Sequence, residues 1–258
     1  MIPEYARVEI MRRIKSAEEE HDVRVLYAVE SGSRAWGFAS PNSDFDVRFI
    51  YVRPKEWYLT VDLEDRRDVI EYPIVDEMDI SGWDVRKALK LFSKSNPGMI
   101  EWLRSPIVYV DDGVFANAAR SIVKDVYSIE KGIYHYRSMA KSNYRGYLRD
   151  DLVPIKKYFY VLKPLLSIMW LERKREPAPI EFHVLREMVQ DNEALNSEIS
   201  KLLARKIASE EKEVAPPIPA LNKFIELELE RLGSLSIDKA ESFSNMDMLN
   251  EVFATVLA

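Results

Sequence analysis

A glycine–serine pair and two closely spaced aspartates are the residues whose types and spacing suggest chemistry. Gly32-Ser33 follows an apolar, strand-like run, and Asp44 and Asp46 come after ten further residues, separated from each other by one residue. Because a strand directs alternate side chains to the same face, the two aspartates are expected to project side by side. Two carboxylates held that close repel each other unless a cation lies between them, and a divalent metal ion is the usual cation.

The glycine–serine turn is interpreted as an anion site. Residues 34–38 have the composition of a short helix, whose first backbone N–H groups favour a phosphate, and the Ser33 hydroxyl adds a donor. The alternative is a glycine turn followed by a strand whose acids face solvent, which is the commoner origin of an isolated Asp-x-Asp pair. The order strand, Gly-Ser turn, Asp-x-Asp, strand favours the functional interpretation. In it, Gly32-Ser33 holds a nucleotide's phosphates and the aspartates hold Mg²⁺ against them.

These residues need a sheet to position them, and the apolar patterns around them predict its strands. The expected elements are a helix at 3–20, a strand at 23–29, a turn and short helix at 32–38, strands at 44–52 and 67–75, helices at 85–95 and 99–103, and a last strand at 107–110. From residue 114 onward the apolar residues recur at helical spacing, with proline and glycine marking the breaks. A boundary between a sheet-containing part and a helical part is therefore expected near residues 111–113.

The composition excludes several classes of protein. The chain has no cysteine, and its three histidines are scattered at His21, His135 and His183, so neither a disulfide scaffold nor a zinc enzyme is expected. A metal would be an oxygen-bound ion such as Mg²⁺ or Mn²⁺. The first 22 residues lack the continuous apolar core of a signal peptide, and no run is long and apolar enough to span a bilayer. The cytoplasm is the expected location, with no membrane partner.

The charge is distributed unevenly along the chain. The net charge is −6, yet residues 131–175 contain eleven Lys and Arg against three Asp and Glu, a local charge of +8, which leaves −14 for the remainder. An acidic protein with one basic segment is suited to a local anion site and not to a long duplex tract. The basic segment is therefore the second candidate functional region.

The motif residues also resemble a known family. Gly32-Ser33 followed by Asp44-Phe45-Asp46 is similar to the signature of the polymerase-β-type nucleotidyltransferases. Four longer blocks resemble the branch called the RNA repair pathway DNA polymerase β family: GSRAWGFASPNSDFDVRFIYV, GWDVRKAL, SNPGMIEWLRSP and KKYFYVLKPLL. They lie between Gly32 and Leu166, over half of the chain. The first block carries the superfamily motif, and the other three are specific to the branch.

This resemblance implies an α+β fold. A polymerase-β-like palm, made of a small mixed sheet with helices, is expected at residues 1–112, and an all-helical domain that completes the nucleotide and substrate cleft is expected at 113–258. The implied reaction is metal-dependent transfer of a nucleoside monophosphate from an NTP to a hydroxyl, with release of pyrophosphate. Asp44 and Asp46 would bridge two Mg²⁺ or Mn²⁺ ions, while Ser33 and the Gly32 backbone hold the β- and γ-phosphates.

Enzymes of this superfamily use a third carboxylate on a neighbouring strand, and the sequence offers several. Asp79 is preferred because it sits where a strand would end, before the Ser81-Gly82 break. Asp84 is the rival, although an aspartate just before VRKALKLFSKS is typical of a helix N-cap. Asp76 and Glu77 are the remaining candidates.

In the resembling enzymes, a helical domain adds cations for the phosphates and an aromatic surface for the base. The candidates in this chain are Lys141, Lys156, Lys157 and Lys163 for phosphate, with Tyr136 and Tyr160 as weaker candidates for stacking. The alternative is that the tyrosines belong to a core and the lysines to a solvated face. Arg34, beside the phosphate turn, would contact phosphate or pair with a palm carboxylate.

The acceptor of the nucleotide follows only from the resemblance. The branch is associated with RNA repair, so an RNA end or short single-stranded region is the leading expectation. Two alternatives stay open. One is a nucleotide-binding regulator or antitoxin-like partner without turnover, and the other is nucleotidylation of a small molecule or a protein. The sequence does not reveal which NTP is used, how many nucleotides are added or the oligomeric state.

Overall fold

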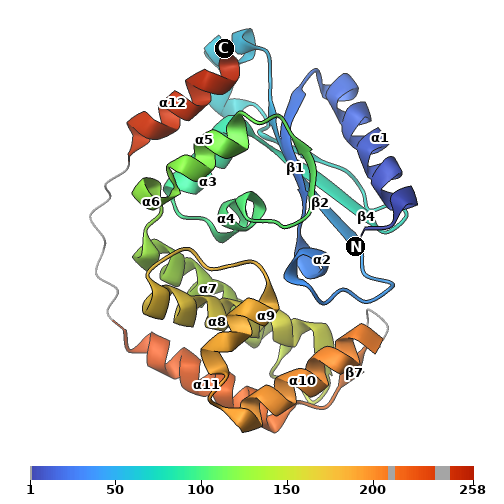
Figure 1. Ribbon diagram of the computed structural model, residues 1–258, viewed down its shortest axis with the longest axis vertical. Helices are drawn as coiled ribbons and strands as arrows, with labels where there is room; N and C mark the ends of the chain where they lie inside the picture. The colour runs from blue at the N-terminus through green and yellow to red at the C-terminus, as the bar shows by residue number, and fades with distance from the viewer. Residues whose placement is uncertain (1, 209–212, 236–244) are drawn as a thin grey trace.

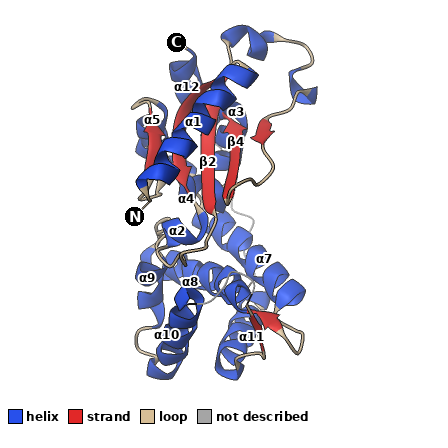
Figure 2. Cartoon of the chain, turned by 90° about the vertical axis from the view of Figure 1, so that its right-hand side faces the viewer, coloured by secondary structure: helices blue, strands red, loops and turns tan. Residues whose placement is uncertain are grey.

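The computed structural model describes residues 2–208, 213–235 and 245–258. A mixed sheet with helices on both faces forms one half of the molecule, and a group of helices forms the other half (Figures 1 and 2). The short helix α2 (Gly32–Trp36) lies where the halves meet, at the lower end of the sheet in both views. The predicted α+β fold, a small mixed sheet with helices followed by a helical region, is confirmed. Among the described residues, no helix has both the length and the apolar character needed to cross a membrane.

Five strands form the sheet, in the order β3-β4-β2-β1-β5. They are β1 (Arg24–Glu30), β2 (Phe45–Val52), β3 (Val69–Glu71), β4 (Met78–Asp84) and β5 (Val108–Asp111). All neighbours are antiparallel except β2 and β4, which run parallel with Phe45 paired to Met78. Because parallel neighbours start at the same edge, the first residues of β2 and β4 lie side by side.

Helices cover both faces of this sheet (Figure 1). Helix α1 (Glu4–His21) packs on one face, where alternate β2 residues such as Val47 and Phe49 are buried. On the opposite face, Ile50 and Val52 pack against a second set of helices. That set comprises α3 (Val85–Ser93), α4 (Pro97–Leu103), α5 (Phe115–Ser121) and α12 (Met246–Leu257). The alternation of the two cores along β2 fixes which side chains share a face.

The other half is built around two long helices, α7 (Ile129–Tyr147) and α8 (Phe159–Lys174), of which α8 is buried along most of its length. Val126 of α6 (Val123–Val126) and Tyr58 of the 3-10 turn Lys55–Leu59 pack with the core of the sheet half, and a further 3-10 turn, Leu63–Asp65, follows the first. The remaining elements of the helical half are α9 (Phe182–Leu185), α10 (Glu193–Ala208), α11 (Pro219–Gly233), 3-10 turns at Ile155–Tyr158 and Arg186–Val189, and the two-stranded pair β6 (Val153–Pro154) and β7 (Val214–Ala215). Their apolar side chains form a core separate from the two on the sheet.

The last described helix returns to the sheet half of the molecule. Leu249, Val252 and Val256 of α12 join the core formed by α3, α4 and α5 (Figure 1). The division into domains at residue 112 stays a prediction. If the chain is instead divided by its apolar cores, α5 and α12 group with the sheet, although both follow residue 112 in the sequence.

Two local expectations were wrong: the strand expected at 67–75 spans only Val69–Glu71, and Ser81-Gly82 is not a strand break. The pair does not end a strand, because β4 continues through it to Asp84. A Cβ atom on Gly82 would lie 2.2 Å from the Phe49 ring, so glycine is required for this ring to pack across β4. The strand ends at Asp84, whose carboxylate accepts the Arg86 N–H at 2.8 Å and so caps α3.

Candidate active site

Two acids predicted from separate considerations meet at the lower edge of the sheet. The parallel register pairs Asp46 of β2 with Asp79 of β4. Their side chains are 27% and 31% exposed, so both are partly shielded yet reachable from solvent. Paired residues on neighbouring strands point to the same face. We refer to Asp46 and Asp79 as the carboxylate pair.

Arg48 is the cation that the protein itself supplies to the carboxylate pair. Its Nη2 donates to Asp46 Oδ1 at 3.2 Å and to Asp79 Oδ2 at 2.7 Å. Its Nη1 donates to the main-chain oxygens of Val47 at 3.0 Å and Asp79 at 2.8 Å. The four contacts fix a planar guanidinium between the two acids and offset their mutual repulsion.

Gly32 is placed where no other residue fits. Its φ of +57° lies in the left-handed region, and a Cβ atom there would come 1.9 Å from Asp46 Oδ2. The backbone of the Gly32-Ser33 turn therefore touches the Asp46 carboxylate directly. The Ser31 N–H also donates to the Asp46 main-chain oxygen at 2.8 Å, which ties the start of α2 to β2.

Glu30, at the end of β1, supports Asp46 from within the protein. It is fully buried, and its Oε1 accepts the Asp46 N–H at 3.0 Å while its Oε2 accepts the Tyr109 hydroxyl. Burial raises the pKa of Glu30 to about 7, although the bonds from Tyr109 and the Asp46 N–H act in the opposite direction. The position of Asp46 thus depends on a buried carboxyl that changes charge near neutral pH.

Asp44 and Arg34 are close in space through the main chain. Arg34 donates from Nε to the Asp44 carbonyl at 3.2 Å and from Nη2 to the Ser43 carbonyl, and its guanidinium lies 3.9 Å from the centre of the Phe45 ring. Arg34 therefore holds the segment before β2 in place and makes no ion pair with a described carboxylate. Asp44 is half-buried, two residues before Asp46.

The rivals of Asp79 have other partners. Asp84 caps α3 and accepts the Tyr58 hydroxyl at 2.7 Å, and burial raises its pKa. Asp76 forms an ion pair with Arg13 at 2.9 Å, and Asp76 and Glu77 both occupy left-handed backbone positions before β4. Register with Asp46 is a property of Asp79 alone among the four.

The structure brings two of the predicted helical-region residues to α2. The Tyr160 ring meets Trp36, the last residue of α2, with 5.4 Å between centroids. Lys157 Nζ lies 4.5 Å from the centre of the Tyr160 ring and 4.1 Å from that of Tyr147. Since α2 begins with the Gly32-Ser33 turn, Lys157 and Tyr160 stand one short helix away from it.

Lys163 is placed differently from the sequence interpretation. Its side chain is 4% exposed and forms an ion pair with Glu101 of α4, and its Nζ lies 4.9 Å from the Trp36 ring. Lys156, Tyr160 and Lys163 have the sequence spacing of one helix face, which predicts that they point the same way. That face does not form, because Lys156 belongs to the 3-10 turn before α8 and Lys163 points into the core. Lys163 joins the helical half to the sheet half.

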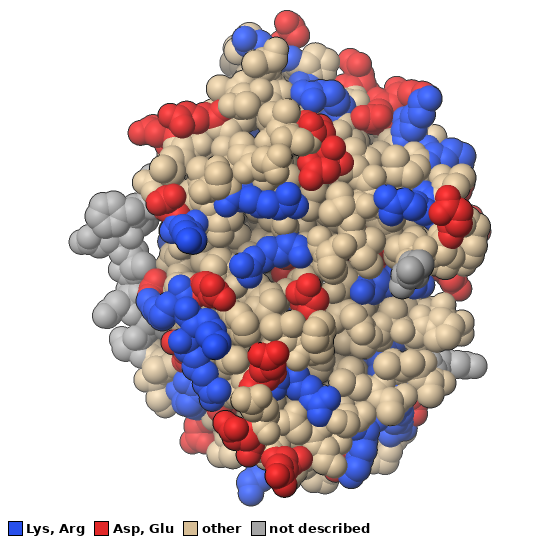
Figure 3. Space-filling model, in the orientation of Figure 1, with Lys and Arg blue, Asp and Glu red and all other residues tan. Residues whose placement is uncertain are grey.

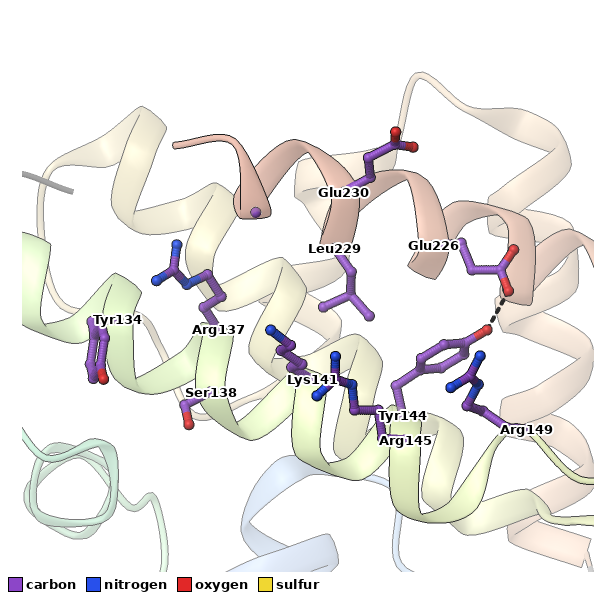
Figure 4. Close-up of a pocket in the computed structure, with 11 residues that line it drawn as sticks. Tyr134, Arg137, Ser138, Lys141, Tyr144, Arg145, Arg149, Glu226, Leu229 and Glu230 are labelled. Carbon is purple, nitrogen blue, oxygen red and sulfur yellow. Dashed lines mark hydrogen bonds between the residues drawn. The ribbon is translucent and has the colours of Figure 1, made fainter. Parts of the chain in front are cut away.

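The remaining predicted residues lie elsewhere. Lys141 is exposed on α7 and lines a hollow next to α11 whose lining includes neither the carboxylate pair nor α2 (Figure 4). Tyr136 is 2% exposed and belongs to the helical core, as the alternative interpretation of the tyrosines expects. Lys156 is half-buried beside Lys157.

The four sequence blocks meet around these contacts. Trp36 of the first block faces Lys163 of the fourth, Lys163 pairs with Glu101 of the third, and the neighbouring Trp102 stacks on Trp83 of the second with centroids 3.8 Å apart. The blocks therefore include a structural junction between the two halves of the molecule, in addition to the acidic motif.

The carboxylate pair has the donor type that Mg²⁺ or Mn²⁺ prefers, since both ions take oxygen ligands. A cation already bridges the two acids in the form of the Arg48 guanidinium, which identifies this point as one of concentrated negative charge. No group of three or more His, Cys, Asp or Glu side chains within the described residues is gathered tightly enough to hold a metal ion. The residue types of Asp46 and Asp79 fit an oxygen-bound metal.

Sequence reasoning missed Arg48 and Glu30. Arg48 follows Asp46 by two residues on the same strand, so the alternation that predicts neighbouring aspartates also predicts an arginine beside them. Glu30 ends an apolar run two residues before Gly32, and a charged residue in that position is a weaker signal.

Comparison with known proteins adds an independent observation. The RNA repair pathway DNA polymerase beta family matches residues 6–255. A protein of Bacillus subtilis (strain 168), described as uncharacterized protein YcgL, is 44% identical over 244 residues, which cover 94% of this chain and 93% of that protein.

Two solved structures resemble the chain more distantly. Spectinomycin adenyltransferase AAD(9) from Enterococcus faecialis, crystallised with ATP and spectinomycin, has a TM-score of 0.39 and 9% identity, covering 98% of this chain and 99% of that one. A nucleotidyltransferase-like protein from Exiguobacterium sibiricum 255-15 has a TM-score of 0.32 and 15% identity, covering 93% of this chain and 78% of the other.

Proposed function

The chain belongs to the RNA repair pathway DNA polymerase beta family, and from this membership we propose that it is a nucleotidyltransferase that moves a nucleoside monophosphate from an NTP to an RNA end. The family supports a nucleotidyltransferase-type activity. The use of a divalent metal and the RNA acceptor are the parts that we propose.

The observation that carries the proposal is the pairing of Asp46 with Asp79. Nucleotidyl transfer needs two or three carboxylates that converge where a hydroxyl attacks a phosphate. Asp46 was selected from its spacing to Asp44, and Asp79 from the need for an acid on a neighbouring strand. Their positions in register beside the Gly32 turn agree with the arrangement that this chemistry requires.

In the proposed mechanism the residues of the chain position the reactants. Asp46 and Asp79 would hold the metal, with Asp44 completing its ligands, and the bound metal supplies charge stabilisation and a lowered pKa for the attacking hydroxyl. The Gly32 backbone and the Ser33 hydroxyl bind the β- and γ-phosphates. Arg48 holds one oxygen of each acid, so their orientation is set before the substrates bind. Asp79 accepts the proton of the acceptor hydroxyl.

The helical half would complete the nucleotide site. Lys157 and Tyr160 are the proposed contacts for phosphate and base because the Tyr160 ring lies against Trp36 of α2 and Lys157 lies over the Tyr160 ring. Lys156 and Lys141 are retained as weaker candidates. Lys163 is assigned to the junction with Glu101 instead, since its ammonium is buried and paired. Arg34 is assigned to holding the segment before β2.

A labelling experiment tests the proposal. Purified protein would be incubated with Mg²⁺, each α-labelled NTP in turn, and short RNAs with defined ends. We expect label in the RNA with the wild type and none with Asp46→Asn, while Asp76→Asn, an exposed acid nearby, serves as the matched control. Wild-type turnover by Asp46→Asn at saturating Mg²⁺ and NTP would refute the assignment of the carboxylate pair.

Other outcomes separate the alternative functions. Label in the protein itself or in an added metabolite would keep the chemistry and exclude RNA as the acceptor. No label in any product, together with tight NTP binding, would indicate a nucleotide-binding regulator.

A further inference from the structure

Cationic side chains recur every fourth residue along α7 and just beyond its end: Arg137, Lys141, Arg145 and Arg149. We call these four residues the α7 row. A helix rises 1.5 Å per residue, so successive members are about 6 Å apart along its axis. They line a hollow of about 580 Å³ between α7 and α11 (Figure 4).

The cations of the row are left without acidic partners. Lys141, Arg145 and Arg149 are exposed, and none of them forms a hydrogen bond or an ion pair with any residue in the described ranges. Arg137 is half-buried and donates from Nη1 to the Leu232 carbonyl at 2.9 Å, which fixes the start of the row against α11. On the face shown in Figure 3, by contrast, basic and acidic side chains are interspersed.

The two acids that border the hollow do little to neutralise it. Glu226 accepts a hydrogen bond from the Tyr144 hydroxyl, which holds its carboxylate at one end (Figure 4). Glu230 points away from α7 in the same view. The concentration of positive charge therefore persists along the side of the hollow that α7 forms, in a protein whose net charge is −6.

We propose that the α7 row binds the backbone of a single-stranded RNA. The row would hold the body of the acceptor strand, so this inference rests on the proposed RNA acceptor and extends it by naming where the strand lies. Even spacing of cations along a straight helix matches the regular spacing of phosphates along one strand. Guanidinium groups, three of the four members, bind phosphate oxygens in pairs.

Aromatic side chains and the shape of the surface favour one strand over a duplex. Tyr134 is 57% exposed at the start of the row, where the Arg137 guanidinium lies 5.7 Å from its ring centre, and it offers a face on which a base can stack. The hollow is bordered by two helices, α7 on one side and α11 on the other. A sequence-independent backbone site is the expected result.

The end of α7 also points toward the candidate active site. Tyr147, the last residue of α7, contacts Lys157, and Lys157 contacts Tyr160 beside α2. A strand bound along the row can therefore continue to the residues that border the Gly32-Ser33 turn.

The test measures binding separately from catalysis. Fluorescence anisotropy would follow a labelled single-stranded RNA of about 12 nucleotides with the Asp46→Asn protein and no NTP. The variant Lys141→Gln/Arg145→Gln/Arg149→Gln is compared with Lys15→Gln/Lys55→Gln/Lys124→Gln, three exposed lysines elsewhere that give the same change in charge.

We expect the α7 variant to bind RNA at least about tenfold more weakly at moderate salt. The slope of log affinity against log salt should also become shallower by about 2, because each phosphate contact to a single strand contributes about 0.7. The control variant should keep the wild-type affinity and slope.

Equal weakening of both variants would overturn the site, as would equally tight binding of duplex RNA or of polyglutamate. If the wild type transfers a nucleotide but binds no RNA, the row is refuted and the proposed transfer stands. If the wild type binds RNA through the row but transfers no nucleotide, the row stands and the proposed transfer is refuted.

Discussion

The carboxylate pair and the α7 row are both dense in charge, but within the described residues the charges of the pair have a partner of opposite sign and those of the row do not. Asp46 and Asp79 share the Arg48 guanidinium, and the main chain of Asp46 is held by Glu30 and Ser31. Three of the four cations in the row form no hydrogen bond or ion pair within the described ranges, and the fourth, Arg137, bonds only to a main-chain oxygen there. Paired charges keep their positions, as reacting groups require, whereas unpaired cations remain available for a mobile polyanion.

The largest expected effect breaks the carboxylate pair. Asp79→Asn should lower the rate of nucleotide transfer by about 100-fold or more, because a ligand to the proposed metal loses its charge while the hydrogen bonds of the strand remain. The rate of label incorporation into RNA measures it. Asp84→Ala is the matched comparison and should leave transfer nearly unchanged while lowering the free energy of unfolding by about 1–2 kcal/mol through loss of the α3 cap. The opposite pattern would make Asp84 the third carboxylate.

The second prediction concerns Lys163, a cation of the basic segment that does have an acidic partner. Lys163→Met leaves Glu101 buried without a counter-ion, so the free energy of unfolding should fall by about 3–5 kcal/mol. Urea unfolding measures this, and Lys174→Met, an exposed lysine on the same helix, should change little. Adding Glu101→Leu should recover much of the loss. If Lys163→Met is as stable as the wild type, the buried ion pair does not form.

The third prediction concerns the buried support of Asp46. The folded protein holds the Glu30 proton up to about pH 7, whereas the unfolded chain releases it near pH 4.5. Stability should therefore fall as the pH rises from about 4.5 to 7 and then level off, by on the order of 3 kcal/mol. Glu30→Gln should remove this decline. Urea unfolding of both proteins at pH 5 and pH 8, with EDTA present, measures it, and parallel pH profiles would contradict it.

A fourth prediction sharpens the role of the built-in cation. Arg48→Gln removes a positive charge from between Asp46 and Asp79, so the affinity for Mn²⁺ should rise by about tenfold. Isothermal titration measures this affinity without turnover. Transfer should nevertheless slow, since the two acids lose their common hydrogen-bond donor. Arg67→Gln, which removes an exposed arginine paired with Glu71, is the control. An unchanged Mn²⁺ affinity would show that no metal binds near Arg48.

The smallest expected effect is the change in the protein's stability when the α7 row loses its charges. Lys141→Gln/Arg145→Gln/Arg149→Gln should change the free energy of unfolding by no more than about 0.5 kcal/mol, because the three side chains make no contact whose loss would matter. Thermal or urea unfolding in the absence of RNA checks this. A clear loss of stability would mean that the row has a structural role.

The sequence predicts the sheet half well because local patterns determine it. Alternation along β2 places Asp46 and Arg48 on one face, with Asp44 just before the strand, and the charged cap at Asp84 marks the start of α3. The parallel register of β2 and β4 could not be predicted, since it depends on contacts between strands far apart in the sequence. Asp79 pairs in register with Asp46, but the reason for preferring it, a strand end at Ser81-Gly82, was wrong because β4 continues and Gly82 makes room for the Phe49 ring.

The helical half was less predictable because local patterns do not determine which of its side chains are buried. A positive net charge identifies a basic segment but not which cations face solvent. Lys163 and Lys141 look alike in the sequence, yet one is buried against Glu101 and the other is exposed beside α11. The difference arises from packing between helices far apart in the sequence, since Lys163 of α8 meets Glu101 of α4. Lys156 differs again, because it lies in the 3-10 turn before Phe159 and a helical periodicity does not apply to it.

The return of α12 to the sheet has a consequence for the order in which the chain folds during synthesis. Leu249, Val252 and Val256 complete a core that otherwise contains residues no later than Val126. While the ribosome is making residues 127–245, the core on that face of the sheet lacks one of its helices, whereas the helices from α7 to α11 already have their own core. The nascent sheet therefore presents an apolar surface for much of translation, and chaperones are expected to recognise it there.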